Sequence, residues 1–312
     1  MSVCQAPPQT TDVCTGVCTV VIVSYYTGPM LLDCLRAALE QDAVDAVVLV
    51  DNGNDVHMRD RVDEIAAANT RLRVLRGFGN VGFARGCNLG VAVASTDYLL
   101  LLNPDCVMRT GVVMRSIDVL TQHPQAAAVT VKIENPDGSE QRGARRNLVS
   151  PKACFVEQFR LDRLLPNHPL AQRINLHETG PVDQVVPVAC ISGAFMMMQR
   201  DAYLALGGMD EDYFLHFEDV DFCLRMHKAG HQLLYIPDIS VMHRKGTSRA
   251  LPLIVEWHKS VSAIKYFNKH FRPDYSGLTL KLISAAVMVR FVVLVIPLTI
   301  TWVWNRGTNG EQ

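Results

Sequence analysis

Short apolar runs alternate with amphipathic stretches of helical period from residue 19 to residue 132, and this alternation constrains the fold more than any other feature. The first cycle is an apolar run at 19–24, a stretch at 30–41 with leucine and alanine on one face, and a second apolar run at 46–51. Such a cycle builds a βαβ unit with parallel strands. The pattern continues with helices expected near 56–68, 83–94 and 111–122 and strands expected at 72–77, 98–103 and 126–132. We therefore expect an α/β fold with a mixed, mostly parallel sheet flanked by helices, in which ligands bind beyond the carboxyl ends of the strands.

The second half of the chain is less regular. Residues 134–184 lose the periodicity and gather proline, glycine, arginine and histidine, so we interpret them as an insertion that shapes one side of the site. Regularity returns with an apolar run at 185–199, a helix at 201–206 and a strongly charged segment at 210–231. We expect this second block to carry the chemistry.

Composition argues against several functional classes. The formal net charge is −1 and no basic stripe is interleaved with aromatic residues, so we expect no nucleic-acid partner. The nine cysteines are scattered and form no CxxC pair, which predicts reduced thiols in a cytosolic chain. Residues 1–16 lack the basic start and the apolar stretch of a secretory signal, and we expect them to form a flexible arm.

Polar side chains follow three of the predicted strands at the point where each strand ends. Ser24 and Tyr25 follow the first strand, Asp51 ends the second, and Asn103 and Asp105 follow the fourth. Each group alone fits an ordinary turn or helix cap. Because the carboxyl ends of parallel strands meet at one edge of a sheet, their joint placement predicts a single site.

A glycine-rich turn at 78–88 leads into the third predicted helix. Backbone N–H groups at such a helix start can bind a phosphate. The turn matches neither GxGxxG nor a P-loop followed by GKS or GKT, which disfavours a Rossmann dehydrogenase or an NTPase. On its own, the turn also fits a tight bend in which glycine adopts a positive φ.

Three carboxylates lie within four residues of the charged segment, at Glu218, Asp219 and Asp221. At a helix start, acidic residues commonly act as caps, and Asp221 can pair with Arg225 four residues further on. A carboxylate that faces a cleft can instead take a proton from a hydroxyl group. The sequence leaves both uses open for Glu218 and Asp219.

A third polar segment follows residue 242. His243 has the chemistry of a metal ligand, and the adjacent Arg244 and Lys245 have the chemistry of phosphate ligands. A lone histidine is more often structural, so this assignment depends on the other segments.

Seven sequence pieces follow one another along residues 17–250. They are VIVSYY, VDNG, NVGFARGCNLG, LLLLNPDC, SGAFMMMQR, GGMDEDYFLHFEDVDFCLR and HRKGTS. In this order they resemble the family-2 glycosyltransferases, with the bacterial rhamnosyltransferases as the branch that looks closest. The resemblance implies a GT-A fold, which is a Rossmann-like α/β domain. Its nucleotide-binding half is expected at about 17–132 and its acceptor half at about 133–250.

The resemblance also implies a donor site. Asp51 lies where the family contacts the donor base. Together with the strand-end residues and the segment after 242, the predicted nucleotide-sugar ligands are Ser24, Tyr25, Asp51, Asn80, Gly82, Arg85, Asn88, Asn103 and Arg244. Asp105 stands at the last position of the D-x-D metal motif, and with His243 it implies a site for Mg²⁺ or Mn²⁺. The first aspartate of that motif is replaced by Asn103.

Asp219, with Glu218 beside it, matches the catalytic base of the family. The implied reaction is an inverting transfer of a sugar, rhamnose from dTDP-rhamnose, to a hydroxyl of a lipid-linked or growing saccharide in bacterial surface polysaccharide synthesis. Asp219 deprotonates that hydroxyl, and a divalent metal neutralises the charge that builds on the nucleotide diphosphate. The alternative is a catalytically silent protein that binds nucleotide sugars or organises an assembly.

Residues 282–304 form the one stretch of the sequence that is long and apolar enough to reach across a bilayer, although Arg290 and Pro297 interrupt it. A basic run between residues 259 and 281 favours contact with anionic lipids. We therefore expect 251–312 to be a helical membrane-associating region at the cytoplasmic face of the inner membrane. The alternative is a helix that packs on the catalytic domain or on the second subunit of a homodimer.

Overall fold

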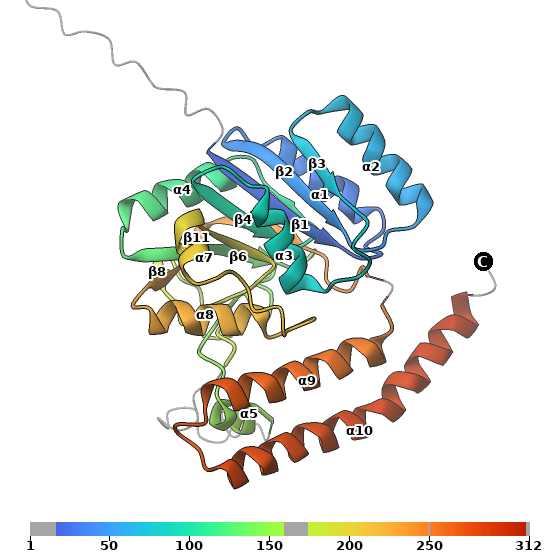
Figure 1. Cartoon of the computed structure of the whole chain (residues 1–312), viewed down its shortest axis with the longest axis vertical. Helices are drawn as coiled ribbons and strands as arrows, with labels where there is room; N and C mark the ends of the chain where they lie inside the picture. The colour runs from blue at the N-terminus through green and yellow to red at the C-terminus, as the bar shows by residue number, and fades with distance from the viewer. Residues whose placement is uncertain (1–16, 159–173, 249, 310–312) are drawn as a thin grey trace, which may run out of the picture.

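The computed structural model describes residues 17–158, 174–248 and 250–309, with side chains described as far as residue 297. The arm expected at 1–16 lies outside the described residues. One nine-stranded sheet forms the centre of the protein, and its strand order is β3-β2-β1-β4-β10-β6-β11-β5, with β8 beside β11. Helices cover both faces of this sheet (Figure 1). The predicted α/β fold is therefore confirmed.

The N-terminal half of the sheet is entirely parallel. Its strands are β1 (Cys18–Ser24), β2 (Val44–Asp51), β3 (Leu72–Leu75) and β4 (Tyr98–Leu102). All seven residues of β1 are buried, because helices cover both faces of the sheet and a central parallel strand then needs apolar side chains on each face. This is why these strands appear in the sequence as continuous apolar runs.

The second half of the sheet is mixed. Strand β6 (Ala126–Glu134) runs parallel to β11 (Gln232–His243), while β10 (Phe195–Gln199) runs antiparallel between β4 and β6. The short strands β5 (Cys106–Met108) and β8 (Val186–Pro187) pair antiparallel with β11. Outside this sheet, β7 (Arg145–Arg146) pairs with β9 (Cys190–Ile191).

Two parts of this half differ from the sequence-based expectation. The continuous run at 185–199 is divided into β8, β9 and β10, because Pro187 and Gly193 interrupt it. Strand β11 was not predicted as a strand. It contains Pro237, and the pairing of β11 with β6 shifts register between Ile236 and Ser240, where a bulge accommodates the proline.

Two apolar cores lie on opposite faces of the sheet. Helices α1 (Met30–Leu39), α2 (Val56–Ala68) and α4 (Val112–Gln122) cover one face, and α3 (Phe83–Ala92), α7 (Arg200–Ala205) and α8 (Glu218–Lys228) cover the other (Figure 1). Helix α3 approaches β1 closely, since a Cβ at Gly90 would lie 2.3 Å from Val21 Cγ1. Gly86 and Gly90 of α3 thus allow the helix that follows the glycine-rich turn to pack directly on the central strand.

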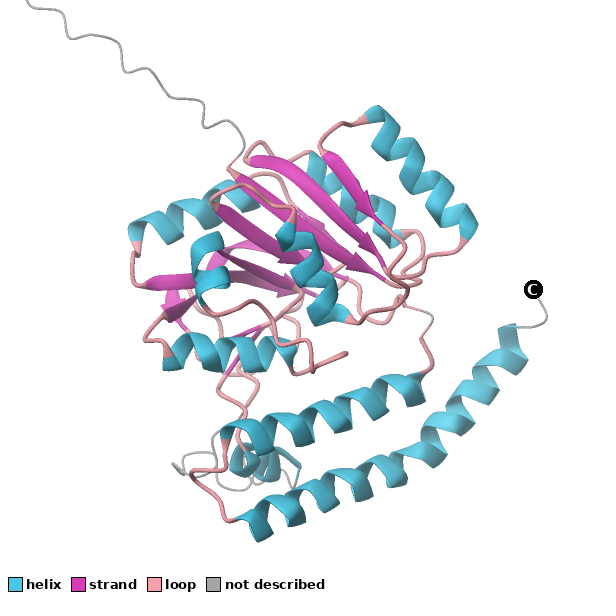
Figure 2. Ribbon diagram, in the orientation of Figure 1, coloured by secondary structure: helices cyan, strands magenta, loops and turns pink. Residues whose placement is uncertain are grey.

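The C-terminal helices α9 (Pro252–His270) and α10 (Gly277–Asn309) run side by side, and α5 (Pro151–Gln158) lies next to them (Figure 2). Tyr266 and Phe267 of α9 belong to the core on the α3 and α8 face of the sheet. Helix α10 contacts α9 through an edge-to-face pair of Trp257 and Phe291 and an ion pair of Arg290 with Glu256.

Most of the α10 surface is apolar and exposed. Within the described residues, Gly277–Pro297 is long and apolar enough to cross a membrane, with a mean hydropathy of 2.2 and 6% of its most apolar window buried. Its most exposed apolar side chains are Leu278, Leu282, Val289, Val292, Val293 and Ile296. The neighbouring surface of α9 adds Leu251, Leu253, Ile254 and Trp257.

Candidate active site

The carboxyl ends of the parallel strands bring the predicted polar residues to one edge of the sheet. Ser24 and Asp51 are direct neighbours in the β1–β2 register, and Asn103 follows β4. The backbone N–H of Asn103 donates to Ala194 O at 3.0 Å, at the start of the antiparallel strand β10. The segment 192–194 therefore joins the same edge.

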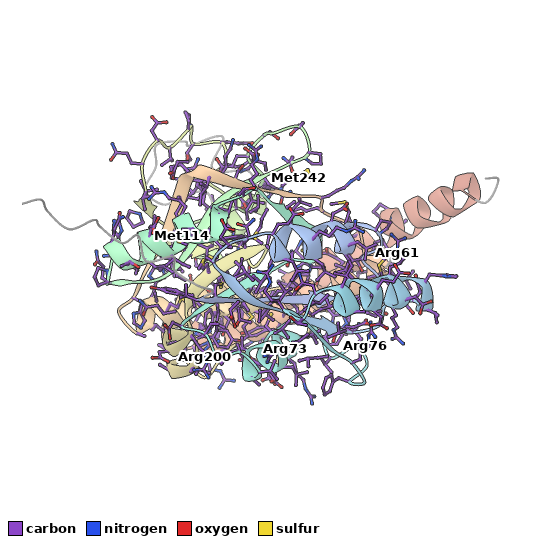
Figure 3. The ribbon with its side chains drawn as sticks, turned by 90° about the horizontal axis from the view of Figure 1, so that it is seen from above. Arg61, Arg73, Arg76, Met114, Arg200 and Met242 are labelled. Carbon is purple, nitrogen blue, oxygen red and sulfur yellow. The ribbon has the colours of Figure 1, made fainter. Side chains whose placement is uncertain are left out.

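Asp51 is held by the protein itself. One carboxylate oxygen accepts the backbone N–H groups of Gly53 at 3.0 Å and Asn54 at 2.8 Å, and the other accepts Arg76 Nε at 3.0 Å. Arg59 Nε lies 3.4 Å from that second oxygen. Arg76, which follows β3 and is labelled in Figure 3, also pairs with Asp63 of α2. Asp51 thus orders the loop after β2, and its contact with a donor base stays a prediction.

Ser24 and Tyr25 lie beside this loop. The buried Ser24 hydroxyl contacts Thr27 Oγ1 at 3.1 Å and exchanges hydrogen bonds with the Asn54 amide. The half-buried Tyr25 ring lies against Gly53. The backbone carbonyl oxygen of Tyr25 accepts a hydrogen bond from the Ser248 hydroxyl at 2.9 Å. Tyr25 therefore connects the first strand end to the segment after His243.

The glycine-rich turn is fastened to the loop before α8. Gly82 caps α3 with φ 83° and ψ 179°, and Phe83 N–H donates to Phe214 O at 2.9 Å. Asn80 Oδ1 accepts the Gly82 N–H at 3.2 Å, while Asn52 Nδ2 donates to Gly82 O at 3.0 Å. The turn thus has the positive φ expected of glycine, and it also opens a helix.

Arg85 and Asn88 both engage the loop after α7. Arg85 is exposed and lies 3.7 Å from Glu211. Asn88 Nδ2 donates to Met209 O at 2.8 Å, and Asn88 Oδ1 accepts the Tyr203 hydroxyl at 2.5 Å. Asn88 thereby holds this loop against α3, and a role in binding the donor sugar stays a prediction for both residues.

His243 and Asp105 form the candidate metal centre. Gln141 donates its Nε2 to Asn135 Oδ1 and His243 O, so its Oε1 is left to accept a hydrogen bond from His243 Nδ1 at 2.7 Å. That bond places the proton on Nδ1, and the Nε2 lone pair then faces Asp105 Oδ1 at 3.0 Å. Two acceptor atoms at this separation require a cation or a proton between them.

The spacing of these two atoms fits a divalent cation. Adjacent ligands of an octahedral Mg²⁺ at about 2.1 Å lie about 3 Å apart, and a carboxylate with an imidazole is a suitable donor pair. Asn103 Nδ2 lies 3.4 Å from His243 Nε2, so the residue that replaces the first aspartate of the motif lies beside the centre. Thr247 Oγ1 donates to the second Asp105 oxygen at 3.0 Å and fixes the carboxylate.

Cys106 also lies close to His243 and Asp105. Burial, with the nearby Asp105, raises the pKa of the Cys106 thiol well above its usual value, and the thiol donates to Ala194 O at 3.4 Å. A neutral thiol is a weak metal ligand. Arg244 follows His243 in the chain and has an exposed side chain. Its backbone N–H donates to Asp105 O at 3.1 Å.

The two adjacent carboxyls at the start of α8 have opposite environments. Burial, with the charge of Asp219, raises the pKa of Glu218 to about 8. Burial also opposes the charge of Asp219, but Arg146 Nη2 at 2.5 Å and the N–H groups of Gly193 and Val220 outweigh it and lower its pKa. Near neutral pH, Glu218 is therefore protonated and Asp219 carries the negative charge.

The backbone before Glu218 is strained. His216 and Phe217 have φ values of 67° and 68°, in the left-handed region that residues other than glycine rarely adopt. Such strain persists where packing fixes the conformation, and the Phe217 ring packs against Tyr266 and Phe267 of α9. The two bends place the α8 N-terminus, and with it Asp219, toward Gly193.

Asp221 has a different role. Its fully buried carboxylate accepts Arg225 Nε at 2.7 Å, Lys269 Nζ at 2.7 Å and His270 Nε2 at 2.6 Å. Although burial opposes its charge, these donors hold the pKa of Asp221 well below its usual value. The pairing with Arg225 agrees with the expectation from sequence, and Asp221 joins α8 to α9.

Sequence reasoning missed three residues of the site: Gln141, Arg146 and Gly193. The first two lie in the irregular stretch at 134–184, and no sequence pattern indicated their contacts. Gly193 lies in SGAFMMMQR, which was quoted only for its resemblance. A Cβ at Gly193 would lie 3.5 Å from Asp219 Cβ, which is an ordinary van der Waals contact and shows how closely the two residues lie.

Comparison with known proteins identifies the family of this chain. The model of the family described as "Glycosyltransferase like family 2" matches residues 16–256. An N-acetylglucosaminyl-diphospho-decaprenol L-rhamnosyltransferase of Mycobacterium tuberculosis is 30% identical over 251 residues, which cover 75% of this chain and 78% of that protein. The rhamnosyltransferase WbbL of Escherichia coli is 25% identical over 172 residues, covering 53% of this chain and 61% of WbbL.

Solved structures are similar in fold. A mannosyltransferase from Pyrobaculum calidifontis, in complex with GDP-Man and Mn²⁺, superposes with a TM-score of 0.55 at 14% identity, over 94% of this chain and 80% of that one. TarS from S. aureus superposes with a TM-score of 0.52 at 13% identity, over 87% of this chain and 70% of that one. The family model spans most of the sequence, and this chain therefore belongs to glycosyltransferase family 2 and has the GT-A fold.

Proposed function

We propose that this protein is an inverting, divalent-metal-dependent glycosyltransferase that transfers rhamnose from dTDP-rhamnose to a hydroxyl of a lipid-linked saccharide. One observation carries the proposal. The segment 192–194 contacts both halves of the chemistry, because Ala194 O accepts the N–H of Asn103 beside His243, and Gly193 N–H donates to Asp219 at 3.3 Å. The candidate metal centre and the charged carboxylate thus share one edge of the sheet.

The carboxyl pair favours a single displacement. Asp219 is ionised and can accept the proton of the attacking hydroxyl, whereas the neutral, buried Glu218 is a poor nucleophile for a covalent intermediate. One displacement inverts the anomeric centre. Asp105 and His243 would hold a Mg²⁺ or Mn²⁺ ion, which neutralises the charge of the departing nucleotide diphosphate.

The donor and acceptor classes come from the relatives. A relative at 30% identity is named as an L-rhamnosyltransferase that acts on a sugar linked through diphosphate to decaprenol, which supports rhamnose as the donor sugar and a lipid-linked acceptor. The exposed apolar face of α10 supports attachment to the membrane that holds such a lipid. The proposed nucleotide-sugar donor supports a site at the cytoplasmic face.

Donor turnover tests the proposal. The protein, with Mg²⁺ or Mn²⁺, is incubated with dTDP-rhamnose and with other nucleotide sugars, each with and without membrane lipid extract. We expect dTDP release that depends on dTDP-rhamnose, metal and lipid together. A protein that binds dTDP-rhamnose by calorimetry and releases no dTDP under any condition would instead be the catalytically silent binding protein.

A further inference from the structure

Arg146 lies at the junction between Asp219 and a second group of cations. Its Nη2 donates to Asp219 Oδ2 at 2.5 Å and to Ile191 O at 2.8 Å. Its Nε is buried and has no hydrogen-bond partner among the described residues. The pairing of β7 with β9 fixes this position, because Arg146 is the register partner of Cys190.

Two further cations gather beside Arg146. Lys245 Nζ donates to the backbone oxygen of Arg142 at 2.9 Å, which joins the segment after β11 to the segment before β7. Lys245 lies within electrostatic range of Arg142, Arg146 and Asp105. Arg142, Arg146 and Lys245 are here named the basic cluster. The cluster adjoins Asp219 through Arg146, and Lys245 follows the candidate metal ligand His243 by two residues.

The basic cluster also connects to the apolar helices. Arg142 forms an ion pair with Glu157 of α5, and the Tyr266 hydroxyl of α9 donates to Val149 O, just before α5, at 3.0 Å. Arg290 of α10 forms an ion pair with Glu256 of α9. A path of contacts thus runs from Asp219 through the basic cluster, α5 and α9 to α10.

Resting on the proposed function, we propose that the basic cluster is the subsite for the diphosphate that links the acceptor sugar to its lipid. The order of groups in such an acceptor is sugar hydroxyl, diphosphate and lipid chain, and the protein presents in the same order Asp219, three cations and an exposed apolar helix. Guanidinium groups bind phosphate oxygens through paired N–H donors, and lysine adds a compact charge.

The test uses the double variant Arg142→Ala with Lys245→Ala, which leaves Arg146 and Asp219 intact. Two acceptors are compared, N-acetylglucosaminyl diphosphate on a short prenyl chain and the uncharged octyl N-acetylglucosaminide. We expect the acceptor KM for the diphosphate compound to rise roughly tenfold or more, from lost charge-assisted contacts, with the KM for the uncharged acceptor and the Kd for dTDP-rhamnose unchanged. The matched control is Arg61→Ala, which changes an exposed arginine of α2 that pairs with Glu64 (Figure 3).

Two outcomes would overturn the subsite. An equal rise in KM for both acceptors would make the cluster structural, and a loss of dTDP-rhamnose affinity would assign it to the donor diphosphate. Calorimetry with the diphosphate compound alone separates this proposal from the proposed function. If the diphosphate compound binds the double variant more weakly than the wild-type protein, the subsite is supported even if no sugar is transferred. If the wild-type protein transfers sugar to both acceptors with the same KM, the subsite is refuted and the proposed function stands.

Discussion

The backbone N–H of Phe83 donates to the carbonyl oxygen of Phe214 at 2.9 Å, across 131 residues of sequence. This bond joins the first turn of α3, in the N-terminal half of the domain, to the loop that leads to Glu218 and Asp219. Gly82 makes the approach possible, because a Cβ at this position would lie 2.4 Å from Phe214 O. This contact thereby holds the glycine-rich turn and the Glu218–Asp219 pair together.

Gly82→Ala should therefore damage both stability and donor binding. Gly82 has φ 83° and ψ 179°, a region open almost only to glycine, so we expect a loss of about 1–3 kcal/mol in the free energy of unfolding and a weaker Kd for dTDP-rhamnose. Gly79→Ala is the control, since Gly79 has φ 66° and no atom within 4 Å of its Cβ position. Equal effects of the two variants would refute the importance of the Phe214 contact.

Asp219→Asn should abolish transfer and leave donor binding nearly intact. The amide cannot accept the hydroxyl proton, so we expect kcat to fall by about 10²–10⁴-fold, while the Kd for dTDP-rhamnose changes little. Steady-state kinetics and calorimetry on the same preparation measure both quantities. Near wild-type turnover in this variant would move the base to Glu218, because Asp221 is fully engaged with α9.

Asp105→Ala and His243→Ala should each weaken the metal dependence of donor binding. Gln141→Ala tests the geometry more finely, because it removes the acceptor that keeps the proton on His243 Nδ1. We expect Mn²⁺ affinity, titrated in the presence of dTDP, to fall by roughly 10–100-fold in Gln141→Ala. Equal donor affinity with and without metal in the wild-type protein would contradict the roles of all three residues.

Glu218→Gln should change how stability depends on pH. The pKa of Glu218 is raised in the folded protein from 4.5 to about 8, so the folded state binds more protons than the unfolded state between these values. The free energy of unfolding of the wild-type protein therefore decreases as pH rises through this window, and the decrease is complete above pH 8. We expect Glu218→Gln to gain on the order of 1–3 kcal/mol relative to wild type between pH 5 and pH 8, measured by urea denaturation. A constant difference across that range would show that Glu218 is ionised throughout.

Removal of residues 278–312 should shift the protein from the membrane fraction to the soluble fraction while the donor site stays assembled. The described part of α10 contacts α9 chiefly on one side and exposes the remainder of its apolar surface. Fractionation of cells that express each form, followed by dTDP-rhamnose binding, measures both effects. Full-length protein that is soluble without detergent, or a truncated form that aggregates, would indicate that α10 is packing surface.

The sequence was sufficient to predict the parallel half of the sheet, because strands buried on both faces need continuous apolar residues. It was insufficient for β11, where Pro237 and Asp238 interrupt the pattern and a bulge restores the pairing. A strand with such an interruption depends on its neighbours, which a local pattern does not contain.

The site divides in the same way. Asp105, His243 and Asp219 follow from ordered motifs, and the structure brings the first two within 3.0 Å. The residues that support them cannot be predicted from such motifs, since Gln141 lies 102 residues from His243 and Arg146 lies 73 residues from Asp219. Those contacts arise from the tertiary arrangement of an irregular segment, and single glutamine and arginine residues carry no local signal.

The buried Asp221 cluster has a thermodynamic consequence. Its hydrogen bonds to Lys269 and His270 connect the start of α8 to the end of α9, so a displacement of α9 would act on Glu218 and Asp219. If the substrate at Asp219 and a lipid on α9 or α10 both bind one position of these helices more tightly, each ligand raises the affinity for the other by the same factor. Bilayer composition would then act on this enzyme as an allosteric effector, with Asp221 as the element that transmits the coupling.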